Sequence, residues 1–284
     1  MSSFFDTLSM YFSYPFVVYS FIVGILIAFS SSLFGASLVL KRNSMIGDGL
    51  SHIAFGAMAV SAVLNISGND MLLVMPFTII SAILILRAGK NSKINGDALI
   101  AMLSVGSLAI GYFIMNLFPV STNISGDVCS SLFGSTEFLN LKPSDVVICS
   151  VFSVAVIILF VFNYHKIFSV TFDEDFSRSC GVSTDGVNLF MAIITAVVIV
   201  LAMNLVGALL ISALIVFPPI SAMRVCKSYF STVIVSALIS VFGAALGIII
   251  SMYIGSPVGS TVAVVNIVIF IFCSLINKIF GKKR

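Results

Sequence analysis

Nine long apolar stretches run through this sequence, and they constrain the fold more than any other feature. A helix needs about 20 mainly apolar residues to cross a bilayer, and strand-like alternation is absent from the stretches. Since every backbone polar group in lipid must be satisfied internally, helices are the expected spanning elements. The stretches lie at roughly 14–40, 46–64, 71–88, 98–118, 145–164, 187–205, 207–224, 229–254 and 260–280. The sequence therefore predicts an all-α, polytopic transmembrane helix bundle of about eight or nine spans.

The composition excludes a water-soluble fold. Of the 284 residues, 60% are apolar and only 9% are charged, whereas a soluble domain carries about 25% charged residues. So few charges cannot cover the surface of a soluble globule, and we expect residues 1–284 to form a single transmembrane domain. A long basic run with interleaved aromatic residues is absent, so nucleic acid is not an expected partner.

The basic residues indicate how the spans are oriented, because Lys and Arg concentrate in cytoplasmic loops. If the N-terminus lies outside and nine spans follow, all of the 14 basic residues except Lys142 fall on the inner side. The sequence thus predicts an N-out, C-in protein. The join at 204–207 is too short for an ordinary loop, so we expect either a broken helix or a tight hairpin there.

Asp48 and His52 are the clearest candidates for function, because ionisable residues inside a membrane span are costly and usually functional. They lie one helical turn apart, which places their Cβ atoms about 5–6 Å from each other. A carboxylate and an imidazole so placed can bind one divalent cation, and this pairing is compatible with Zn, Mn or Fe. The alternative is an Asp–His hydrogen bond that only holds the bundle together. The glycines at 47, 49 and 56 are expected to let neighbouring helices approach closely.

A second candidate lies in the inner connection at 165–186. Its apolar residues Phe172, Phe176 and Cys180 recur every four positions and so share one face of a short helix. The acidic run 173–175 falls in the first turn, where the helix dipole favours anions. Such a helix on the cytosolic side is a candidate docking element, and the alternative is a solvated loop helix without a partner.

The sequence contains none of the common hydrolytic motifs. It lacks the phosphate-binding pattern G-x-x-x-x-G-K-[ST] and the zinc-protease pattern H-E-x-x-H. Gly-Leu-Ser-His-Ile at 49–53 is not a nucleophile elbow, because the second Gly is missing. We therefore do not expect the chain to be an enzyme, and any ATP hydrolysis would belong to another chain.

Four strings resemble the permease subunits of zinc, manganese and iron ABC importers, the ABC-3 family. Their order and spacing fit over nearly the whole chain. They are LKRNSMIGDGLSHIAFG at 40–56, DEDFSRSCGV at 173–182, VGALLISALIVFPP at 206–219 and GSPVGSTVA at 255–263. The chain departs from the family pattern at Gly49, where Ala is common, and at Pro219, but neither departure removes a candidate ligand.

The resemblance implies the permease subunit of an ATP-driven importer in the bacterial cytoplasmic membrane. The cargo would be Zn or Mn, possibly Fe, with no permanently bound cofactor, and Asp48 and His52 would line its path. Three partners are implied: a cytosolic ABC ATPase dimer, an extracytoplasmic metal-binding protein and a second copy of the chain. Residues 169–182 would form a coupling helix that transmits ATPase closure to the bundle. The residues expected to take part in coupling are Phe172, Asp173, Glu174, Asp175, Phe176 and Arg178.

Three other functions stay open at the level of sequence. A secondary divalent-cation transporter usually needs several intramembrane acids for coupling, and here there is little beyond Asp48. An ABC permease for a bulkier metal chelate would not need the Asp48–His52 pair. A structural or assembly membrane protein would carry the pair only for packing. The sequence does not distinguish Zn from Mn as the cargo.

Overall fold

The computed structural model describes residues 10–64, 70–91, 96–118 and 143–280. Within these ranges the regular structure is entirely helical, as predicted. The short helix is α9 (Glu174–Ser179). The long helices are α2 (Pro15–Leu40), α3 (Met45–Val63), α4 (Asp70–Asn91), α5 (Gly96–Leu117), α8 (Pro143–Phe172), α10 (Thr184–Val206), α11 (Ala208–Val225), α12 (Tyr229–Ile254) and α13 (Val258–Phe280).

Most of these helices can cross a membrane. Eight helices in the described ranges are long and apolar enough to do so. In α4 the apolar part is shorter and covers Leu73–Arg87. The prediction of eight or nine spans is confirmed. The number is eight without α4 and nine if α4 also crosses the membrane.

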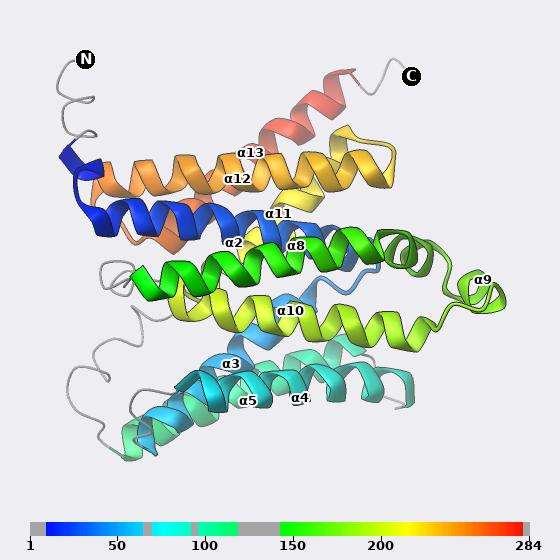
Figure 1. Ribbon diagram of the computed structural model, residues 1–284, viewed down its shortest axis with the longest axis horizontal. Coiled ribbons are helices and arrows are strands. Elements are labelled where there is room, and N and C mark those ends of the chain that lie inside the picture. Colours follow the sequence, from blue (N-terminus) through cyan, green and yellow to red (C-terminus); the bar gives the residue numbers. More distant parts are fainter. Residues whose placement is uncertain (1–9, 65–69, 92–95, 119–142, 281–284) are drawn as a thin grey trace.

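The connections that carry basic residues gather at one end of the bundle. In Figure 1 the α2–α3 connection, α9, the α11–α12 connection and the C-terminal end of α13 all lie on the right. Lys41 and Arg42 follow α2, Arg178 lies in α9, and Lys227 lies between α11 and α12. This arrangement is the one that the predicted orientation requires, and the assignment of this end to the cytoplasm stays a prediction.

Helix α2 lies inside the bundle, in contact with α8, α10, α11 and α12, while α3, α4 and α5 form a group that α10 and α11 join to the rest. Buried hydroxyl groups fasten α2 to α12. Ser240 donates a hydrogen bond to the main-chain oxygen of Ala28 (2.7 Å). The hydroxyl oxygens of Ser37 and Tyr229 are also 2.7 Å apart. Such bonds satisfy buried polar groups that lipid cannot hydrate.

A single residue joins α10 to α11. Gly207 has φ 90° and ψ 154°, a conformation that glycine adopts readily because it has no Cβ. Helix α10 begins, and α11 ends, at the α9 end of the bundle (Figure 1). The chain therefore reverses at Gly207, and of the two predicted forms the structure has the tight hairpin.

Helix α8 extends beyond the apolar stretch predicted at 145–164. It runs to Phe172, and Ile167 and Val170 near its end are buried. Because this packing continues past the apolar stretch, residues 169–172 end α8 instead of opening the next helix. The predicted helical segment 169–182 is corrected accordingly: only Glu174–Ser179 is a separate helix.

The start and end of α9 follow from its sequence. Asp173 is its N-cap residue, and its Oδ1 accepts a hydrogen bond from the main-chain N–H of Phe176 (2.8 Å). Such a cap satisfies one of the free N–H groups of a helix start. After the helix, Gly181 has φ 83°, the left-handed conformation that ends many helices.

Candidate functional site

Asp48 and His52 lie together in the first half of α3. The Nε2 of His52 is 3.6 Å from the Oδ2 of Asp48, and the two side chains are 29% and 48% exposed, respectively. A hydrogen bond between these groups would measure about 2.7–3.2 Å. Two ligand atoms that each bind one tetrahedral zinc ion at about 2.0–2.2 Å lie roughly 3.3–3.6 Å apart. The spacing is therefore too long for an Asp–His hydrogen bond and fits two ligands of one cation.

Among the residues that the structure describes, Asp48 and His52 do not by themselves make a complete metal site. In the described ranges there is no group of three or more His, Cys, Asp or Glu side chains that could hold a metal ion. The Nδ1 of His52 is buried and has no hydrogen-bond partner there. A cation at Asp48 and His52 would need further ligands, from water, from another span or from a second copy of the chain.

Close helix contacts hold α3 in place, as the glycines predicted. A Cβ on Gly47 would lie 3.2 Å from the Ile215 side chain of α11. A Cβ on Gly56 would lie 2.7 Å from the main-chain oxygen of Ser107 in α5, and Gly49 also lies against α5. The helix that carries Asp48 and His52 is therefore fixed from two sides.

Ser51 adds a polar contact on the side of α3 that faces α11. Its Oγ donates to the main-chain oxygen of Asp48 (2.7 Å) and lies 3.4 Å from the Oγ of Ser212. The hydroxyl is thus engaged by the backbone and by α11, and it is fully buried. Ser51 therefore supports the position of α3.

The second predicted site, around α9, lies at the end of the bundle and is exposed. The side chains of Phe172 and Phe176 are 61% and 62% exposed. Asp175 and Arg178 are also exposed, whereas Asp173 caps the helix. The structure thus presents two largely exposed aromatic rings beside charged groups, which suits a protein-docking surface.

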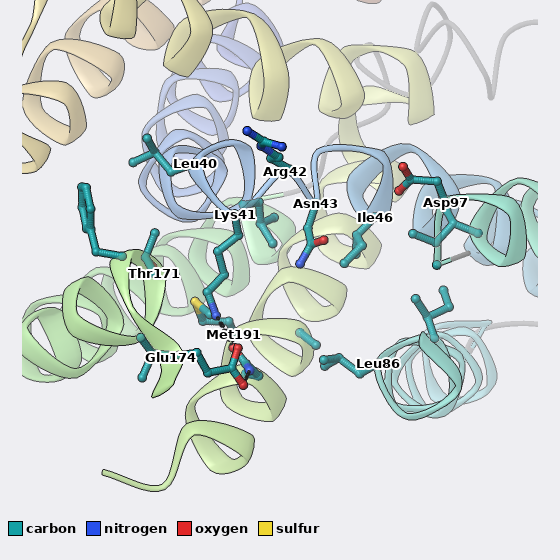
Figure 2. A pocket seen from close by; sticks show the side chains of 18 residues that line it. Leu40, Lys41, Arg42, Asn43, Ile46, Leu86, Asp97, Thr171, Glu174 and Met191 are labelled. Atoms are coloured by element: carbon teal, nitrogen blue, oxygen red, sulfur yellow. Dashed lines mark hydrogen bonds and ion pairs between the residues drawn. The ribbon is translucent and has the colours of Figure 1, made fainter. Parts of the chain in front are cut away.

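Glu174 differs from its neighbours because it faces the bundle. A cavity of about 530 Å³ lies between the α2–α3 connection and helices α4, α5, α8 and α10 (Figure 2). Lys41, Glu174 and Asn188 line it. The Nζ of Lys41 donates a hydrogen bond to the Oδ1 of Asn188, and the Nδ2 of Asn188 donates to the Oε1 of Glu174 (3.1 Å). The Lys41 Nζ also lies 3.9 Å from the Oε2 of Glu174.

Sequence reasoning missed this network. From the sequence, Lys41 is only one of the basic residues that mark the inner side, and Glu174 is an expected coupling residue in an acidic first turn. Asn188 in α10 bridges the other two residues. The three residues come from separate elements, and Lys41 and Asn188 are 147 positions apart in the sequence. One sequence feature could have indicated the network: Lys41 directly follows an apolar stretch. A lysine that is buried in such a place needs a hydrogen-bonding or charged partner.

The fold and these sites define a multi-pass membrane protein with an Asp–His pair inside one span and an exposed short helix at one end. The chain belongs to the ABC 3 transport family, whose model matches residues 13–277.

Relatives in sequence agree with this assignment, and a solved structure shares the fold. The chain is 27% identical over 241 residues to the "High-affinity zinc uptake system membrane protein ZnuB" of Buchnera aphidicola, covering 85% of this chain and 90% of that one. It is 25% identical to the "Manganese import system permease protein ScaB" of Streptococcus parasanguinis, covering 91% and 89%. Its fold is similar to that of PsaBC from Streptococcus pneumoniae in complex with Fab, with a TM-score of 0.82, 23% identity and coverage of 96% and 94%.

Proposed function

We propose that this chain is the permease subunit of an ATP-driven importer for a divalent transition metal, Zn or Mn, in the bacterial cytoplasmic membrane. The observation that carries the proposal is the Asp48–His52 pair inside a span, with ligand atoms 3.6 Å apart. Membership of the ABC 3 transport family and the zinc and manganese relatives support the same reading. The metal is cargo, so a two-ligand site that releases it easily suits the task.

The exposure of the pair supports a pathway between two copies of the chain. Asp48 is 48% exposed on a single chain, although it belongs to a span. Ionisable side chains in spans face a bundle interior or a water-filled cavity and avoid lipid. A second copy against this face would shield the pair from lipid and supply further ligands, so the working unit is a homodimer.

The energy source and the metal donor are separate chains in this proposal. The sequence has no phosphate-binding loop, so a cytosolic ABC ATPase dimer would hydrolyse ATP. It would dock on α9 and the adjoining end of α8, through Phe176 and Phe172, whose rings are exposed, beside Asp175 and Arg178. An extracytoplasmic metal-binding protein would deliver the ion at the opposite end of the bundle.

The metal content of cells tests this proposal. Cells that lack this chain and redundant importers would be grown in limiting Zn, Mn or Fe and analysed by elemental mass spectrometry. We expect the content of one metal to fall, and to recover when the wild-type chain is restored together with its ATPase but not without it. Unchanged contents of all three metals would contradict the proposal. Loss of uptake only for a supplied metal chelate would favour the permease for bulkier substrates.

A further inference from the structure

The Lys41–Asn188–Glu174 network joins three elements at the α9 end of the bundle. Lys41 directly follows α2, Glu174 is the first residue of α9, and Asn188 lies in α10. In Figure 2 the Lys41 side chain extends from the α2–α3 connection across to Glu174. The network therefore links the exposed helix α9 to the end of α2 through side chains alone.

Because Lys41 is buried, its charge depends on the partners within this network. Its side chain is only 10% exposed, and Asn188 is 8% exposed. A charged group removed from water is costly unless it is paired and hydrogen-bonded. If α9 moved away, the buried Lys41 would lose the Glu174 carboxylate that lies beside its charge. Movement of α9 is therefore expected to pull the end of α2 with it.

A tight connection carries any such displacement onward to α3. The N–H of Lys41 donates to the main-chain oxygen of Ser37 (3.1 Å), and that of Asn43 donates to the oxygen of Leu38 (2.9 Å). Arg42 between them has φ 60°, a conformation that a non-glycine residue holds only when its surroundings fix it. Helix α3 begins at Met45. The connection between α2 and α3 is short and held by hydrogen bonds. A shift of Lys41 is therefore expected to displace the first turn of α3, which contains Asp48.

We infer that Lys41 is a positioning residue that relays movement of α9 to the Asp48–His52 pair. The inference rests on the proposed function, in which α9 receives the ATPase. ATP-driven displacement of α9 moves Glu174, the network moves Lys41, and the short connection reorients the start of α3. Lys41 does not touch the ion, so its loss uncouples ATP hydrolysis from metal movement instead of abolishing metal binding.

The test measures metal uptake and ATP hydrolysis in the same proteoliposomes that hold the complete complex with its ATPase. Lys41→Met removes the charge and Lys41→Arg keeps it. Asn188→Asp keeps the acceptor for Lys41 but removes the donor to Glu174. Lys166→Met is the matched control, because Lys166 is an exposed lysine in α8. Gel filtration of each complex shows whether it assembles.

We expect Lys41→Met to lower the number of ions transported per ATP by about tenfold, within the range of usual coupling between sites. ATP hydrolysis should persist, Lys41→Arg should retain most of the coupling, and Asn188→Asp should lose part of it. Lys166→Met should behave as wild type. If Lys41→Met fails to assemble, Asn188→Asp and Lys41→Arg decide the question.

Two results would overturn the relay while leaving the proposed function in place. In the first, Lys41→Met and Asn188→Asp transport as many ions per ATP as the wild type. In the second, assembled variants lose uptake and ATP hydrolysis in equal proportion, which would make the network a docking support. A wild-type complex that hydrolyses ATP but moves no metal would instead contradict the proposed function, and the relay with it.

Discussion

Gly56 in α3 faces Gly111 in α5, so closely that a Cβ on Gly111 would lie 3.2 Å from the Cα of Gly56. A Cβ on Gly56 would lie 2.7 Å from the main-chain oxygen of Ser107. Close approach of this kind is how small residues let membrane helices pack without a hydrophobic driving force. The contact fixes α3, and with it the direction in which Asp48 and His52 point.

Replacement of Gly56 should therefore destabilise the protein. Gly56→Val forces side-chain atoms against the backbone of α5, and overpacking of this kind costs about 1–3 kcal/mol. We expect a lower melting temperature in detergent and a smaller yield of folded protein. Gly106→Ala, also in α5, is the matched control, because a Cβ there meets nothing within 4 Å. Equal melting temperatures for the two variants would show that the contact is not tight.

The hairpin at Gly207 gives a second prediction. With φ 90° and ψ 154°, Ala at this position would hold a strained backbone conformation that costs about 1–3 kcal/mol. We expect Gly207→Ala to lower the melting temperature, whereas Gly96→Ala, at the start of α5 with open space around it, should change it little. A Gly207→Ala variant as stable as the wild type would mean that the reversal does not depend on this conformation.

The orientation of the bundle can be tested through the cysteines. Cys180, just after α9, is exposed, and the predicted topology places it inside. A variant that keeps only Cys180 should react with a membrane-impermeant maleimide in inside-out vesicles and not in intact cells. Cys226 is a poorer probe, because burial raises the pKa of its thiol and the thiolate is the reactive form. Labelling of Cys180 in intact cells would reverse the assignment.

Much of the fold could be predicted from the sequence, because lipid allows few alternatives. Apolar stretches located the long helices, including α3 with Asp48 and His52 one turn apart. The prediction that failed concerned where one helix ends. The extent of α8 depends on tertiary packing at Ile167 and Val170, which the periodicity of the sequence does not reveal. The form of the join at Gly207 depends on one backbone conformation.

Of the candidate sites, one could be predicted from the sequence and the other could not. Two residues four apart on one helix are neighbours by geometry, so the Asp48–His52 pair was accessible from the sequence. The Lys41–Glu174 pairing was not, since it depends on how α2 and α9 meet in space. The family resemblance drew attention to α9 but did not indicate that Glu174 faces inward.

The most direct test of the central claim, that the pair lies on the metal path, uses the two histidines of the chain. His52→Ala would be compared with His165→Ala, which alters an exposed side chain in α8. The measurement is ATP-dependent uptake of radioactive Zn or Mn into proteoliposomes that contain the assembled complex. We predict that His52→Ala lowers uptake at least about tenfold, because loss of a ligand should cost no less than the roughly tenfold that loss of a residue supporting a ligand costs, and that His165→Ala leaves it unchanged. Wild-type uptake by an assembled His52→Ala complex would contradict the account.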